Sequence, residues 1–108
     1  MIHITKKIAG YYWSLYLLND HAAGVTVYAD NNENLGYIRF GADNAVPIPN
    51  QYMDNRFTIN LKWSNMSHVI DLLRNEGPVY IHITIDDNNK LNYAEISTQL
   101  EPAGDGEL

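Results

Sequence analysis

The stretch FTINLKWSNMSHVIDLLRN, residues 57–75, decides the fold class because the spacing of its apolar residues changes halfway along. Apolar and polar residues alternate from Phe57 to Trp63, which is typical of a half-buried strand. From Met66 to Leu73 the apolar residues fall at i, i+3, i+4 and i+7, which predicts a short amphipathic helix. The Gly-Pro pair that follows ends this helix. A strand followed directly by a helix therefore forms the centre of the fold.

Two alternating segments upstream of this stretch predict a β-hairpin. The pairing that places like residues opposite each other sets Val27 opposite Ile38 and Tyr28 opposite Tyr37. The apolar pairs then share one face of the hairpin, and the tyrosines share the other. This sorting predicts one buried face and one amphipathic face.

A second hairpin is predicted at the C-terminal end. Its strands are joined by a two-residue asparagine turn at 88–89. A loop of that length sets Ile81 opposite Ile96 and His82 opposite Glu95, so the apolar faces again agree.

The predicted fold class is α+β, with an antiparallel, strongly curved sheet of about six strands. It consists of a meander of four strands, one helix at about 65–76 packed on one face, and a C-terminal hairpin. Residues 2–18 form one long strand, or two strands that meet at Gly10. We expect 1–100 to be a single domain and 101–108 to be a flexible acidic tail. A helix of roughly eleven residues spans about 16 Å and leaves much of such a sheet uncovered, so we expect a homodimer.

Composition narrows the classes of partner and compartment. The chain has 108 residues, a formal net charge of −6 and no cysteine, which fits a reducing compartment. It shows no signal-peptide pattern and no apolar run of the roughly 18 residues that span a membrane, so a cytoplasmic protein with no membrane partner is expected. Nucleic acid is not an expected partner because the cations are scattered, unless strand packing gathers Lys6, Arg39 and Lys62.

Aromatic residues are concentrated in GYYWSLYLL, residues 10–18. One face of this strand is expected in the core against the helix, and it carries Tyr11, Trp13, Leu15 and Leu17. If Tyr16 of the other face pairs with Tyr28, a row of tyrosines forms the predicted ligand or partner surface. The members of this row are Tyr12, Tyr16, Tyr28 and Tyr37. The row could stack bases or sugar rings, could form a protein interface, or could cover the edge of the core if the sheet curls far enough.

Polar clusters give weaker functional signals. His82 and Glu95 form the one acid and base pair that the predicted register places side by side, and we expect it to be a solvent-face pair. The run from Asp30 to Asn34 matches the start of a calcium loop, but Leu35 stands where that loop needs glycine, so an ordinary turn is expected. No catalytic residue, metal site or cofactor is predicted.

Three functions stay open. The first is a small, non-catalytic, bacterial-type interaction or regulatory module that acts through its aromatic, acidic surface and is expected to be a homodimer. The second is a single-stranded nucleic-acid-binding module. The strand meander followed by a helix over residues 11–76 resembles the element order of the Whirly family of single-stranded-DNA-binding proteins, although clustered basic residues are missing here. The third is a small enzyme that uses His82 and Glu95.

Overall fold

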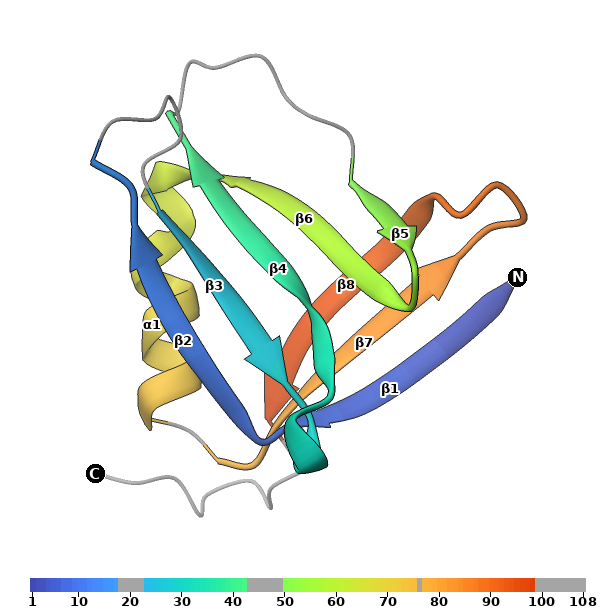
Figure 1. Ribbon diagram of the computed structural model, residues 1–108, viewed down its shortest axis with the longest axis horizontal. Coiled ribbons are helices and arrows are strands. Elements are labelled where there is room, and N and C mark those ends of the chain that lie inside the picture. Colours follow the sequence, from blue (N-terminus) through green and yellow to red (C-terminus); the bar gives the residue numbers. More distant parts are fainter. Residues whose placement is uncertain (18–22, 43–49, 76, 99–108) are drawn as a thin grey trace, which may run out of the picture.

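The computed structural model describes residues 1–17, 23–42, 50–75 and 77–98 (Figure 1). It confirms the α+β class, with one α-helix in the described part of the chain packed against largely antiparallel sheet. The elements in chain order are β1 (Ile2–Ile8), β2 (Gly10–Leu15), β3 (Ala23–Tyr28), the 3-10 turn η1 (Asp30–Asn32), β4 (Asn34–Gly41), β5 (Gln51–Met53), β6 (Arg56–Lys62), the 3-10 turn η2 (Trp63–Asn65), α1 (Met66–Asn75), β7 (Val79–Ile85) and β8 (Leu91–Thr98). The predicted tail at 101–108 lies outside the described residues.

The strands form two sheets instead of the single six-stranded sheet predicted. One has the order β1-β7-β8 and the other the order β2-β3-β4-β6-β5. The predicted bend near Gly10 is the corner between them: Ile8 pairs with Val79 in the first sheet, and Gly10 pairs with Tyr28 in the second. Ala9, the residue between the two strands, donates its backbone N–H to the Tyr28 carbonyl at 2.7 Å.

The predicted four-stranded antiparallel meander is wrong at its last strand. Strands β2, β3 and β4 are antiparallel neighbours, but β6 lies parallel to β4. The cause is β5, which falls inside the stretch 41–56 that carries no strand pattern. β5 pairs antiparallel with β6 through a turn at Asp54 and Asn55, whose φ angles are 56° and 63°. This extra reversal changes the direction of β6, so the element order that resembles the Whirly family is interrupted.

The two predicted hairpins differ in how well their registers hold. In the C-terminal hairpin Ile81 pairs with Ile96 and His82 with Glu95, as predicted. In the β3–β4 hairpin Val25, not Val27, pairs with Ile38. The predicted register is therefore wrong by two residues, because η1 and a bulge beside Tyr28 take up chain between the strands. A register shift of two residues leaves every side chain on the same face of the sheet. The predicted separation of the apolar residues from the tyrosines is therefore confirmed.

The hydrophobic core lies between the five-stranded sheet on one side and α1 with the three-stranded sheet on the other (Figure 1). Its buried members are Ile8, Val25, Val27, Leu35, Ile38, Phe40, Phe57, Ile59, Val69, Leu73, Val79, Ile81, Ile83, Ile85 and Leu91. Burial of each such side chain stabilises the fold by about 1.5–3 kcal/mol before the cost of ordering it. The helix contributes Val69 and Leu73, as its spacing predicts.

The core assignment of β2 is only partly right. Tyr11 and Trp13 pack against the core, and the Trp13 ring stacks on Phe40 with centroids 5.8 Å apart. Leu15 and Leu17 were also expected there, but they are 67% and 82% exposed. Leu15 is the last residue of an edge strand, so a neighbouring strand covers it on one side only.

No helix in the described ranges is both long enough and apolar enough to cross a membrane.

Candidate tyrosine surface

The tyrosine face is the side of the five-stranded sheet that points away from the core, and it carries Tyr12, Tyr16, Tyr28 and Tyr37. Tyr12 and Tyr28 lie on adjacent strands and are offset by two residues, because Gly10 is the residue directly opposite Tyr28 and Tyr12 is opposite Thr26. Their rings stack with centroids 5.9 Å apart and an interplanar angle of 26°. The expected pairing of Tyr16 with Tyr28 is therefore wrong, since Tyr16 lies beyond the end of β2.

Tyr37 connects Tyr16 to the sheet. Its hydroxyl donates a hydrogen bond to the Tyr16 hydroxyl at 2.8 Å. Its ring lies across the backbone of Gly24, where a Cβ atom would overlap the Tyr37 hydroxyl oxygen and Cζ. Burial raises the pKa of Tyr37 well above its usual value, and the hydrogen bond to Tyr16 raises it further. Sequence reasoning missed this packing because it placed Gly24 in the loop before the strand, whereas β3 begins at Ala23. A glycine directly before the alternating residues 25–28 is the signal that could have indicated it.

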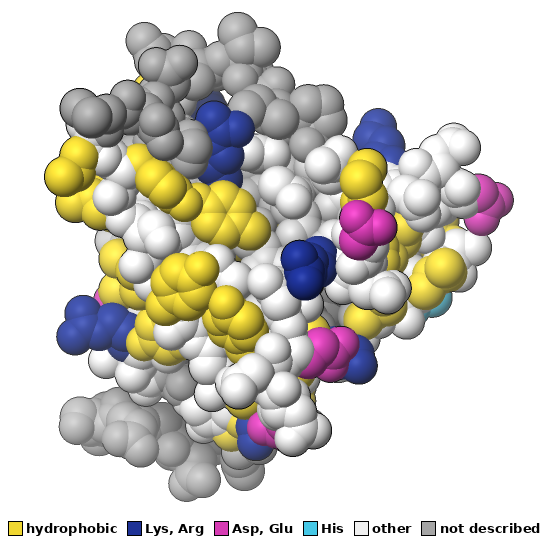
Figure 2. Space-filling model, in the orientation of Figure 1, with side chains coloured by type: hydrophobic (Ala, Val, Ile, Leu, Met, Phe, Trp, Pro, Cys, Tyr) yellow, Lys and Arg dark blue, Asp and Glu magenta, His cyan; other side chains and the backbone are white. Residues whose placement is uncertain are grey.

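The four tyrosines differ in exposure. Tyr12 is 53% exposed, and the other three are partly buried. Burial and a hydrogen bond to Tyr12 raise the pKa of Tyr28, while nearby Arg56 acts in the opposite direction. Figure 2 shows this side of the molecule, with hydrophobic side chains, tyrosine included, gathered over β2, β3 and β4. No described helix or strand covers these rings, so the sheet does not curl over them within the described part of the chain.

Cations gather on the same face. Alternation along β4 and β6 directs Arg39, Arg56 and Lys62 outward with the tyrosines, and Arg39 lies near enough to Tyr37 to affect its pKa. The five strands of this sheet contain no Asp or Glu. Lys6, which was considered with Arg39 and Lys62, lies instead on β1, where its ammonium is 4.0 Å from the Glu33 carboxylate.

The whole chain carries seven Lys and Arg residues and thirteen Asp and Glu residues, a formal net charge of −6. The strands of the sheet that bears the tyrosine face carry three of the cations and no carboxylate, although Asp54, in the turn between β5 and β6, lies two residues before Arg56.

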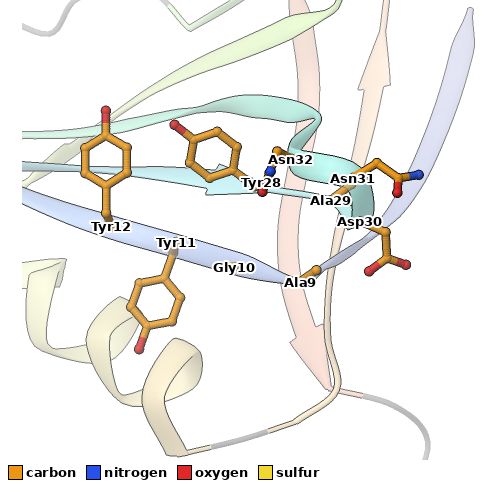
Figure 3. Close-up of a pocket in the computed structure, with 9 residues that line it drawn as sticks. All are labelled: Ala9, Gly10, Tyr11, Tyr12, Tyr28, Ala29, Asp30, Asn31 and Asn32. Carbon is orange, nitrogen blue, oxygen red and sulfur yellow. The ribbon is translucent and has the colours of Figure 1, made fainter.

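A cleft of about 340 Å³ adjoins the tyrosine face where β2 begins (Figure 3). It is lined by Ala9, Gly10, Tyr11, Tyr12, Tyr28, Ala29, Asp30, Asn31 and Asn32. The rings of Tyr12 and Tyr28 stand on one side of β2, while the Tyr11 ring points to the other, toward α1 (Figure 3). The 3-10 turn η1, which lies within the turn predicted from Asp30 to Asn34, lines the end of the cleft. Asn31 and Asn32 have φ angles of 64° and 61°, which asparagine tolerates.

The predicted pair of His82 and Glu95 lies in the other sheet. His82 Nε2 is 4.0 Å from Glu95 Oε1, and both side chains are partly exposed. The two imidazole nitrogens form hydrogen bonds with hydroxyls: Nδ1 with Thr5 at 3.0 Å and Nε2 with Ser97 at 2.9 Å. The cleft beside Gly10 does not include His82 or Glu95.

The described residues contain no cluster of three or more His, Asp or Glu side chains arranged to hold a metal ion. Comparison of the chain with protein-family models, with curated proteins and with solved structures found no match.

Proposed function

We propose that this chain is a non-catalytic module that binds single-stranded nucleic acid on the tyrosine face. The observation that carries the proposal is the joint presence of four tyrosines and three cations on a sheet whose strands contain no carboxylate. Single-strand binders combine aromatic rings that stack on bases with a cationic surface that follows the phosphates. Strand packing directs Arg39, Arg56 and Lys62 to the same side of the sheet as the tyrosines, which supports a strand path along β4 and β6.

The expected binding energy comes mainly from stacking. Each base stacked on a tyrosine contributes about 1–3 kcal/mol, whatever the base. Contacts from Arg39, Arg56 and Lys62 would make log K fall with log salt concentration with a slope of about −2, because each contact contributes about 0.7 for single strands. The proposed binding is therefore tolerant of sequence, moderate in affinity and only moderately sensitive to salt.

Fluorescence anisotropy with a labelled oligothymidylate of about 20 nucleotides tests the proposal. Tyr12→Ala is expected to weaken binding by about 1–3 kcal/mol through lost stacking. Tyr93→Ala is the matched control, because Tyr93 is 52% exposed, close to the 53% of Tyr12, but lies on β8 of the other sheet. Unchanged anisotropy of the oligonucleotide with the wild-type protein at low salt would contradict the proposal.

A second pair of variants tests whether the cations of the tyrosine face contact phosphate. Arg56→Gln is expected to make the salt slope shallower by about 0.7, since it removes one phosphate contact. Arg74→Gln removes a cation from α1, away from the tyrosine face, and is expected to leave the slope unchanged. Equal slopes for the two variants would show that the cations of this face do not contact phosphate.

A second candidate is the interaction or regulatory module, acting as a homodimer through the same side of the molecule. The exposed Leu15 and Leu17 beside the tyrosines favour a protein partner. A symmetric pairing of two tyrosine faces would also bring the cations of both copies together with no carboxylate from these strands, which disfavours it. Light scattering after size-exclusion chromatography separates the candidates: a stable dimer that Tyr12→Ala dissociates would support the protein interface.

A further inference from the structure

We propose that the cleft beside Gly10 is a base pocket, in which one nucleobase of the bound strand lies against the rings of Tyr12 and Tyr28. This inference rests on the proposed function and goes beyond it, because it assigns a site and a recognition role to one end of the tyrosine face. It is argued from the shape of the cleft, its polar groups and the position of a cation outside it.

The shape follows from a missing side chain. Gly10 occupies an outward position on β2, opposite Tyr28 and two residues before Tyr12, so a larger residue there would stand beside both rings. A Cβ atom at Gly10 would meet nothing within 4 Å. The glycine therefore leaves an open space bounded by aromatic rings on the outward side of the strand (Figure 3). Its volume of about 340 Å³ lies at the small end of ligand sites, which suits a single ring system.

The polar groups suit the edge of a base. Asn32 lies beside Tyr28 (Figure 3), and its carboxamide can both donate and accept hydrogen bonds, as the edges of nucleobases do. The Asp30 carboxylate points away from the two rings (Figure 3), but its negative charge at this end of the cleft repels phosphate. A base is thus favoured inside the cleft, while its phosphate is disfavoured there.

A cation outside the cleft adds to this division. Arg56 is the first residue of β6, points to the tyrosine face by the alternation of that strand, and is not among the residues that line the cleft. Its charge acts to lower the pKa of Tyr28. A nucleotide can therefore place its base against the Tyr12 and Tyr28 rings and its phosphate on the side of Arg56, away from Asp30.

Two glycine variants test the pocket. Gly10→Val fills the cleft with a residue that suits a strand, and it is expected to weaken oligothymidylate binding about tenfold by excluding one stacked base. Gly41→Val is the matched control, because Gly41 also points outward and its Cβ position is open, but it lies at the far end of β4. We expect this control to bind within about twofold of the wild type, since it removes no stacked base. Equal binding by the two variants would overturn the pocket.

A second measurement uses the wild-type chain and needs no variant to fold. Adenosine 5′-monophosphate is expected to shift the backbone amide resonances of Gly10, Ala29 and Asn31 in a nitrogen-15 correlation spectrum. If the oligonucleotide binds but the mononucleotide shifts none of these amides, the pocket is wrong and the proposed function stands. If the oligonucleotide does not bind at all, the proposed function fails, while shifts of these amides would still support a base pocket. Shifts produced by a neutral disaccharide and not by the mononucleotide would overturn the base pocket in favour of a sugar site.

Discussion

Replacing Gly24 with alanine tests the packing that holds the tyrosine face together. Gly24 is buried in β3, and the Tyr37 ring lies so close to it that an added Cβ would overlap the hydroxyl oxygen and Cζ. The ring must therefore move away from the sheet, and its 2.8 Å hydrogen bond to Tyr16 must break. The core lies on the opposite side of β3 and is left unchanged.

The expected cost follows from three contributions. Forcing a side chain into an occupied space costs about 1–3 kcal/mol. Loss of the hydroxyl hydrogen bond adds about 0.5–1.5 kcal/mol. The lower backbone entropy of alanine in the unfolded chain offsets about 0.4–1 kcal/mol. Gly24→Ala should therefore destabilise the protein by about 0.5–4 kcal/mol, and the central value of about 2 kcal/mol lowers the Tm by roughly 8–16 °C for a domain of this size.

Urea denaturation followed by circular dichroism measures this change. Gly41→Ala is the control, because its Cβ finds open space, and its unfolding free energy should change by less than about 0.5 kcal/mol or rise slightly. Adding Tyr37→Ala should remove most of the cost of Gly24→Ala, since the obstructing ring is gone. Equal midpoints for Gly24→Ala and Gly41→Ala, or additive effects in the double variant, would refute the proposed ring packing.

Three further predictions concern pH, a turn and the core. The raised pKa of Tyr37 means that the unfolded chain loses this proton first, so stability should fall as the pH rises above 10 and should fall less in Tyr37→Phe, as measured by alkaline melting curves. Asp86 accepts backbone N–H bonds from Lys90 at 3.0 Å and from Asn88 at 2.8 Å, which lower its pKa below the usual 3.8. Stability from this turn should therefore be lost as the pH falls below about 4, and Asp86→Ala should show a lower Tm at pH 7 and a weaker acid dependence than the wild type. Phe40→Ala should destabilise by about 3–5 kcal/mol because Phe40 is fully buried, whereas a loss under 1 kcal/mol in a denaturation curve would contradict the assigned core.

Part of the candidate surface was predictable from the chain. Alternation along β3 and β4 separates Tyr28 and Tyr37 from the valines and isoleucines of the core, and that separation survives a register error of two residues. The contacts between the tyrosines were not predictable in the same way. They depend on which residue of β2 stands opposite Tyr28, and this is set by the corner at Ala9 where the chain passes from one sheet to the other.

The sequence by itself determined the helix, most of the strands and the register of the C-terminal hairpin. The helix and the strands follow from the spacing of apolar residues that are close in the chain. The register of the hairpin follows from the two-residue turn at 88–89, which fixes the residues that pair on either side of it. Only the tertiary structure decided that β1 pairs with β7, that β6 runs parallel to β4, and that Arg39, Arg56 and Lys62 share a face with the tyrosines. The pairing of strands that are far apart in the chain depends on which apolar faces are buried together. The additional reversal of the chain at β5 makes β6 run parallel to its neighbour β4. The position of these three cations on the same side as the tyrosines is a consequence of that pairing, which depends on contacts between distant strands and not on the order of charges along the chain.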